Sequence, residues 1–211
     1  MRVRVYIDGF NLYYGMKQKM RQTRRWKGVR WLDLHAFSKS FLRRDDYLDG
    51  TFYFTARVSG GDTAQRQDTY WQALDTLPDV ELIEGRFALR EKRGKLTTPP
   101  YRIVTVEAYE EKRSDVNLAA RLVFDGCQGL YQKAIVISND SDLTEPVRLV
   151  TQVMGKEVLV FNPHPANTRS DELHQYATNG WELRMRRITA NQLPNPVITV
   201  WGARIEKPEC W

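Results

Sequence analysis

Two short apolar segments of this chain, residues 3–7 and 134–137, run into aspartates. Asp8 follows the first segment directly, and Asp140 and Asp142 come shortly after the second. Short runs of β-branched and apolar residues are typical of buried strands in a parallel sheet. Because sites in such sheets form outside the carboxyl ends of the strands, we expect these acids to gather at one edge.

The rest of the chain alternates between strand and helix patterns. The expected strands are residues 3–7, 51–58, 80–89, 101–108, 134–137 and 157–161, and the expected helices are residues 11–20, 32–42, 62–77, 115–124, 141–154 and 173–177. This order predicts an α/β fold with a mostly parallel sheet and helices on both faces. A basic loop over residues 90–100 favours a β-hairpin inserted in the sheet or extending it.

Length and composition favour a single domain. The 211 residues, of which 42% are hydrophobic, suffice for one α/β core and are too few for two independent ones. We expect residues 1–189 to form this domain. Residues 190–211 contain three prolines and are expected to form a tail packed on it. Within the tail, residues 197–200 are a candidate edge strand.

The charge distribution favours an anionic partner. The formal net charge is +6, and residues 17–30 contain seven basic residues and no acid: Lys17, Lys19, Arg21, Arg24, Arg25, Lys27 and Arg30. Trp26 and Trp31 flank the end of this stretch. Basic side chains contact phosphates and exposed tryptophan stacks on unpaired bases, so the stretch is a predicted nucleic-acid interface. The alternative is a solvated charged face with both tryptophans buried.

The sequence shows no signal for export or membrane insertion. The two cysteines, Cys127 and Cys210, lie far apart and form no CxxC motif. The N-terminus is interpreted as a strand rather than a signal peptide. No apolar run approaches the ~20 residues that a membrane helix needs. A cytoplasmic protein without a membrane partner is expected.

A third region can add an acid to the same edge, because Asp115 lies at the start of a predicted helix that Ser114 can cap. Together with Asp8, Asp140 and Asp142 it would form an oxygen-rich pocket suited to Mg²⁺ or Mn²⁺. Each acid alone has a plainer explanation as a turn, helix-start or capping residue. The shared position of the strand-end acids favours the metal site.

Four segments in this order resemble the NYN domain, a family of the PIN-like nuclease superfamily. They are residues 6–12 (YIDGFNL), 111–119 (EKRSDVNLA), 136–143 (VISNDSDL) and 155–158 (GKEV). The resemblance extends from about residue 3 to residue 178. It implies a Rossmann-like, PIN-like sheet and a metal-dependent ribonuclease activity. Cleavage is expected within the RNA chain, leaving a 5′-phosphate and a 3′-hydroxyl.

The resemblance also assigns roles to individual residues. Metal and catalytic roles fall on Asp8, Asp115, Asp140 and Asp142, with Mg²⁺ or Mn²⁺ as the cofactor. Asn11 matches a family asparagine near the site, where its amide would orient water, metal or phosphate. Ser138 is expected to hydrogen-bond an acid or a phosphate oxygen. The expected partner is RNA, single-stranded or structured, and a homo-oligomer is left open.

Two residues depart from the family pattern. Asn139 stands where many relatives have glycine, and Arg121 stands where some carry another acid; Asp125 is a possible substitute for that acid, and Asp171 is a candidate late acid. These departures favour an alternative, a catalytically inactive RNA-binding or scaffold protein that retains the fold. A metal-dependent phosphatase or a DNA flap-type nuclease is a third possibility.

Overall fold

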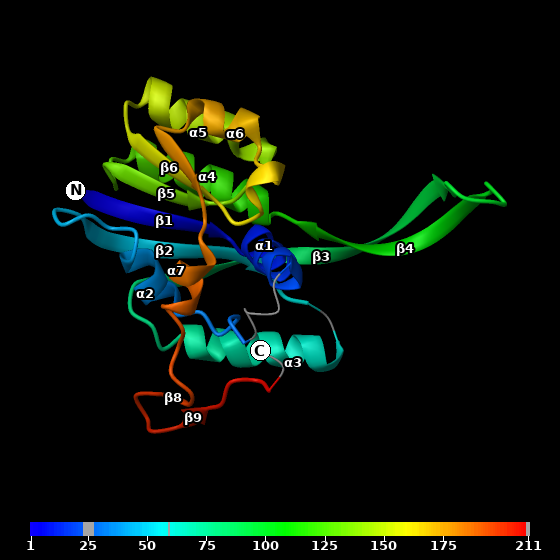
Figure 1. The fold of residues 1–211 in the computed structure, drawn as a ribbon, viewed down its shortest axis with the longest axis horizontal. Helices are drawn as coiled ribbons and strands as arrows, with labels where there is room; N and C mark the ends of the chain where they lie inside the picture. Colours follow the sequence, from blue (N-terminus) through cyan, green and yellow to red (C-terminus); the bar gives the residue numbers. More distant parts are fainter. Residues whose placement is uncertain (23–27, 59, 210–211) are drawn as a thin grey trace.

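In the computed structural model, which describes residues 1–22, 28–58 and 60–209, a seven-stranded sheet runs through the centre of the protein (Figure 1). The strand order is β4-β3-β2-β1-β5-β6-β7, and all neighbours are parallel except β3 and β4. The bounds are β1 Arg2–Asp8, β2 Tyr47–Ala56, β3 Val80–Lys95, β4 Ile103–Lys112, β5 Lys133–Ile137, β6 Glu157–Asn162 and β7 Asn179–Glu182. The predicted α/β fold with a mostly parallel sheet is confirmed.

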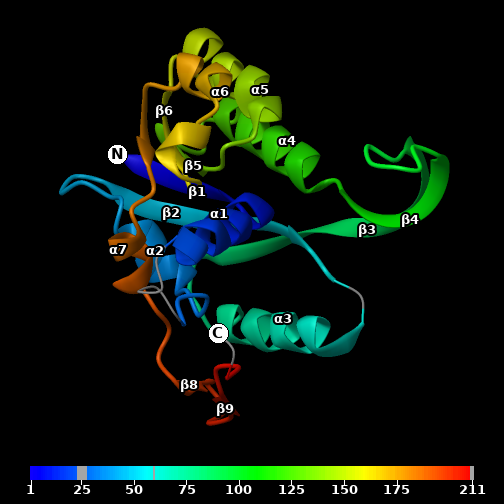
Figure 2. The ribbon, with the colours of Figure 1, turned by 45° about the vertical axis from the view of Figure 1, so that its right-hand side comes forward.

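Helices cover both faces of this sheet (Figure 1, Figure 2). One face carries α1 (Gly9–Gln22), α2 (Leu34–Lys39), α3 (Gly61–Leu74) and α7 (Met185–Thr189), and the other carries α4 (Ser114–Cys127), α5 (Thr144–Arg148) and α6 (Asp171–Tyr176). Within β1, Val5 and Ile7 enter one hydrophobic core and Tyr6 enters the other, because successive side chains of a strand point to opposite faces. The strand that ends in Asp8 is therefore central and buried on both sides.

The expected hairpin is present, but its strands are longer than the sequence indicated. Pairing of β3 with β4 continues to Lys95 and Ile103, so most of the predicted loop 90–100 is strand. The outer part of the two strands projects from the body of the protein as an arm (Figure 1). Exposed Leu89 and Val106 lie on this arm. On this arm, cross-strand side-chain pairs between β3 and β4 stabilise the two strands.

Two expected helices differ in the structure. The helix predicted at 32–42 is confined to α2, because Asp33 caps it by accepting a hydrogen bond from Ala36 N, and Leu32 forms a β-bridge with Gln192. The helix predicted at 141–154 is divided into a 3-10 turn (Ser141–Leu143), α5 and a π-helical turn (Leu149–Val153). None of the helices in the described part of the chain is long and apolar enough to cross a bilayer.

The tail packs on the α1, α2 and α3 side of the sheet. Leu193 N donates to Trp31 O at 2.8 Å, and Trp31 Nε1 donates to Pro194 O at 2.9 Å. The expected edge strand at 197–200 is wrong: β8 (Val197–Ile198) pairs with β9 (Arg204–Ile205) in a separate two-stranded sheet. The contacts with Trp31 hold the tail on the helical layer, away from either edge of the main sheet.

Candidate metal centre

Asp8 is the last residue of β1, and α1 begins at once with Gly9. This turn requires glycine, because a Cβ at Gly9 would lie 2.7 Å from the carbonyl oxygen of Phe54. Asp8, which precedes this turn, is only 2% exposed. Its carboxylate accepts hydrogen bonds from Asn11 N at 2.9 Å, Asn11 Nδ2 at 2.7 Å and Ser138 Oγ at 2.9 Å.

These donors counteract the cost of burying a charge only in part. Burial raises the pKa of Asp8 and the negative charge of Asp140 raises it further, while the hydrogen bonds from Asn11 and Ser138 lower it. The net direction is upward. The carboxylate is therefore well oriented, and among the described residues none of the main influences on its pKa is a positive charge.

Asp140 follows β5, the neighbour of β1. The two strands are parallel and Ile7 pairs with Ile137, so their carboxyl ends lie side by side. The Asp140 carboxylate caps the following 3-10 turn by accepting from Asp142 N at 3.0 Å, and Asp140 N donates to Ser138 Oγ at 3.1 Å. Ser138 thus connects Asp140 to Asp8.

Asp115 lies in the first turn of α4, the helix that follows β4 in the chain. The turn before it is tight: Arg113 has φ 84°, and a Cβ at Gly85 would lie 2.6 Å from the Glu111 carboxylate. The left-handed residue Arg113 starts the helix, so the predicted cap at Ser114 is wrong and Ser114 is helical. Burial and the charges of Asp8 and Asp140 raise the pKa of Asp115 to about 6.

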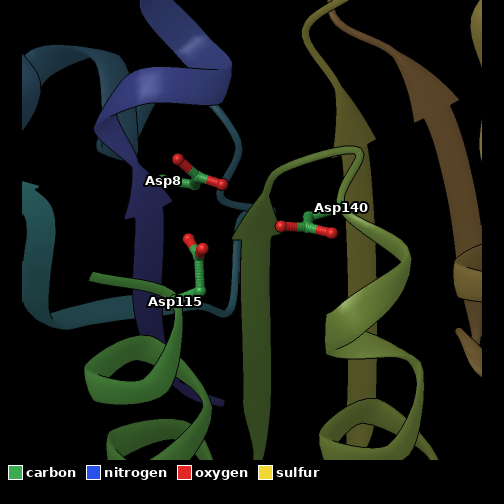
Figure 3. Close-up of side chains that lie close together, drawn as sticks. All are labelled: Asp8, Asp115 and Asp140. Atoms are coloured by element: carbon green, nitrogen blue, oxygen red, sulfur yellow. The ribbon is translucent and has the colours of Figure 1, made fainter. Parts of the chain in front are cut away.

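The three carboxylates meet at the carboxyl edge of the sheet. One oxygen from each of Asp8, Asp115 and Asp140 lies within 4.8 Å of the others, and Figure 3 shows the side chains facing a common space. The charged neighbours that raise the pKa of Asp115 most are the acids Asp8, Asp140, Glu111 and Asp142. Three carboxylates at this spacing form a ligand set for a hard divalent cation such as Mg²⁺ or Mn²⁺.

Asp142 does not join this group, in contrast to its predicted role as a metal ligand. Its side chain is exposed, and it lies outside the group formed by the three other acids. The reason is local: the 3-10 turn that starts at Ser141 uses Asp140 as its cap and turns the next acid outward. Asp142 still contributes a negative charge that raises the pKa of Asp115.

The other candidate acids lie elsewhere. Asp125 is completely buried and forms ion pairs with Arg4 at 2.9 Å and Arg121 at 3.0 Å, so it does not replace a missing ligand. The Arg121 guanidinium also lies 3.4 Å from the Glu81 carboxylate. Arg121, which departs from the family pattern, therefore forms ion pairs within the fold. Asp171 is exposed, pairs with Arg169 at 2.9 Å and takes no part in the group.

The polar neighbours of the acids mainly support the loop after β5. Asn139 N donates to Asn11 Oδ1 at 3.2 Å, and the Asn139 side chain donates to Thr168 O at 2.7 Å and accepts from Ser170 N at 2.8 Å. Asn11 therefore positions Asp8 and the loop together. Ser138 is fully buried and donates to Asp8, which makes it a support for an acid rather than a phosphate contact.

Only part of the predicted basic interface can be located. Lys17 and Arg30 lie over the Tyr13 ring, at 5.9 and 5.5 Å from its centroid. Arg24, Arg25, Trp26 and Lys27, which were also predicted to contact nucleic acid, lie outside the described residues. Trp31 is 1% exposed and belongs to the core, so it is unavailable for base stacking. The alternative of a buried tryptophan is therefore confirmed for Trp31.

Comparison with known proteins identifies the family to which this chain belongs. The NYN domain family matches residues 2–180, so this chain belongs to the NYN domain family. A curated relative is 30% identical over 100% of this chain and 75% of its own length: the 6-hydroxy-3-succinoylpyridine 3-monooxygenase HspA of Pseudomonas putida.

A solved structure supports the fold. A Vibrio parahaemolyticus protein of unknown function is similar with a TM-score of 0.55 and 15% identity, covering 87% of this chain and 93% of that one. At this identity the similarity concerns the fold alone.

Proposed function

We propose that this protein is a metal-dependent ribonuclease that hydrolyses phosphodiesters within RNA at the Asp8, Asp115 and Asp140 cluster. The observation that carries the proposal is the approach of three carboxylates to within 4.8 Å at the carboxyl edge of a parallel sheet. Membership of the NYN domain family supports the same chemistry and a PIN-like arrangement of the sheet. Mg²⁺ or Mn²⁺ is the proposed cofactor.

The residues at the cluster have two roles, metal ligation and orientation of the ligands. Asp8, Asp115 and Asp140 would hold the cation, which when bound activates water and stabilises negative charge on the leaving oxygen. Asn11 and Ser138 fix the Asp8 carboxylate through three hydrogen bonds. Asn11 also accepts from Asn139 N. This arrangement keeps the ligands oriented before metal and substrate arrive, which reduces the reorganisation required during the reaction.

Cleavage of labelled RNA and DNA oligonucleotides with Mg²⁺, Mn²⁺ or EDTA tests the proposal. We expect metal-dependent RNA cleavage that falls by about 100-fold or more in Asp8→Asn and Asp140→Asn, because each removes a charged ligand. Asp171→Asn is the matched control, since Asp171 is an exposed acid outside the cluster. RNA cleavage that survives both cluster substitutions contradicts the metal-carboxylate mechanism.

Two other outcomes have distinct signatures. Binding of RNA without cleavage under any metal would identify an inactive RNA-binding or scaffold protein. Preferential cleavage of DNA flaps, or of phosphate monoesters, would instead identify another activity of an acidic metal cluster. The same oligonucleotide panel, extended with a flap substrate and a chromogenic phosphate ester, distinguishes these cases.

Oxygenation of a small aromatic compound is a second candidate function. The relative in Pseudomonas putida is named as a monooxygenase of a pyridine compound, and a pocket lined by aromatic residues lies next to the acids of this chain. Incubation with 6-hydroxy-3-succinoylpyridine, dioxygen and a reductant, followed by liquid chromatography, tests it. Consumption of the compound that depends on the protein would favour this function over RNA hydrolysis.

A further inference from the structure

A pocket of about 370 Å³ lies beside the metal centre, between α1, α3 and the end of β2. Gly9, the residue after Asp8, forms part of its wall, and Tyr53 forms another part. A Cβ at Gly9 would lie 2.9 Å from Tyr53 Cζ and 3.0 Å from the Tyr53 hydroxyl, so this ring lies against the residue that follows the acid. The pocket therefore adjoins the turn that carries Asp8.

Aromatic residues form much of the pocket lining: Phe10, Tyr13, Tyr14, Tyr53, Tyr70, Trp71 and Phe87. Phe10 contacts Phe87 edge to face at a centroid separation of 5.8 Å, and Tyr13 contacts Tyr14 in the same manner at 5.3 Å. Tyr14 is 55% exposed, so its ring is accessible from solvent. Planar rings at the rim of a pocket are suited to stacking on a planar ligand.

The charges of the pocket are all positive. Lys17, Arg30 and Arg66 line it together with no acidic residue from the described part of the chain. Lys17 and Arg30 both lie over Tyr13, whereas Arg66 is close to Asp62 at 4.0 Å and donates to Thr63. Lys17 and Arg30 are therefore the cations best placed to meet an anionic ligand.

From these features we infer that the pocket binds one nucleotide of the RNA strand, adjacent to the phosphate at the metal centre. The base contacts the rings of Phe10, Tyr13 and Tyr14, and the nucleotide's phosphate contacts Lys17 and Arg30. Aromatic stacking and charge recognition are two of the main interactions that hold single-stranded RNA in proteins. This inference rests on the proposed ribonuclease function and adds to it a site that positions the strand.

Titration with uridine and adenosine 5′-monophosphate in EDTA tests the pocket separately from the metal. We expect Tyr14→Ala and Lys17→Ala each to weaken nucleotide binding by about fivefold or more, since each removes one of the two interactions. The matched controls are Tyr101→Ala, whose ring is also 55% exposed but lies at the tip of the arm, and Lys39→Ala at an exposed position. Both controls should bind as the wild type does.

Competition with pyridine-3-carboxylate distinguishes a nucleotide from a free aromatic acid. Absence of nucleotide binding, nucleotide binding that both pocket variants leave unchanged, or binding of the pyridine acid alone would each overturn the inference. If RNA is cleaved and the pocket variants retain the wild-type KM, the pocket inference fails and the ribonuclease stands. If the variants lose nucleotide binding but the wild type cleaves no RNA, the ribonuclease fails and the binding site stands.

Discussion

Asp8 and Asp125 are both buried aspartates, yet their surroundings are opposite. Asp125 is fully buried and lies between the Arg4 and Arg121 guanidinium groups, with Tyr6 Oη donating to it at 2.8 Å. Asp8 is 2% exposed, and among the described residues its donors are the neutral Asn11 and Ser138, with Asp115 and Asp140 as acidic neighbours. The chain thus neutralises one buried carboxylate itself and leaves the other in a negative cluster.

This difference separates a structural acid from a functional one. A buried carboxylate that is paired with guanidinium groups of the same chain needs no bound cation. The guanidinium carbon of Arg121 also lies 4.4 Å from the centroid of the Phe52 ring, which helps to hold Arg121 in place. A cluster of like charges destabilises the fold until a cation binds. Four experiments, given in order of decreasing expected effect, test this contrast.

Removal of the structural carboxylate should have the largest effect on stability. Asp125→Ala leaves Arg4 and Arg121 without their shared partner, and we expect the free energy of unfolding to fall by about 3–5 kcal/mol. Urea denaturation monitored by tryptophan fluorescence measures the change. Asp171→Ala breaks only an exposed ion pair and should cost less than about 1 kcal/mol. Equal costs for the two substitutions would remove the basis for calling Asp125 structural.

Acidification should weaken metal binding by the cluster. Because the pKa of Asp115 is raised to about 6, protons compete with the metal below neutral pH. We expect the dissociation constant for Mn²⁺ to increase roughly tenfold between pH 7 and pH 5, which corresponds to about 1.4 kcal/mol. Calorimetric titration at both pH values measures it. A pH-independent constant would show that Asp115 does not ligate the metal.

Neutralising Asp115 should stabilise the metal-free protein at pH 7. Its folded pKa is above its ordinary value of 3.8, so this group's contribution to stability is fully present below about pH 4 and is lost as the pH rises through 6. Asp115→Asn removes the ionisable group, so the substituted protein does not lose stability when the pH rises through 6. After allowance for its partial exposure, we expect a gain of about 1 kcal/mol and a Tm increase of about 2–4 °C. A lower Tm in EDTA at pH 7 would contradict the proposed repulsion.

The smallest effect is expected at Asp142. Asp142→Asn removes an exposed charge outside the cluster, and we expect the affinity for Mn²⁺ to change by less than about threefold. Asp140→Asn, two residues earlier, should abolish detectable binding at millimolar Mn²⁺. The pair is closely matched because both residues belong to the same loop. Similar losses in the two variants would place Asp142 among the ligands after all.

The sequence indicated the sheet and all three clustered acids, Asp8, Asp115 and Asp140. Apolar runs that end in Asp8 and Asp140 identify neighbouring strand ends, because parallel strands share the direction of their carboxyl ends. The short strand β7 and the helix α7 were missed. The sequence of β7, Asn179-Gly-Trp-Glu182, contains only one strongly apolar residue, so hydrophobic periodicity gives no signal there.

Spacing along the chain was a poor guide for Asp142, the fourth acid predicted to join the cluster. Asp142 is close to Asp140 in sequence and lies outside the cluster, whereas Asp115 comes from a helix on the other side of the turn after β4. The ion pairs of Asp125 were also not predicted from the sequence. Its partners Arg4 and Arg121 come from β1 and α4, and no local pattern reveals that a charge will be neutralised by a distant strand.

The sequence by itself determined the alternation of strands and helices, the family and the strand-end positions of Asp8 and Asp140, because these depend on local periodicity and on short motifs. The tertiary structure alone decided that Asp142 stays outside the cluster and that Asp125 is neutralised. Convergence depends on close backbone approaches at Gly9 and Gly85 and on the orientation of each side chain at a turn. These are contacts between segments far apart in the chain, and only folding brings them together.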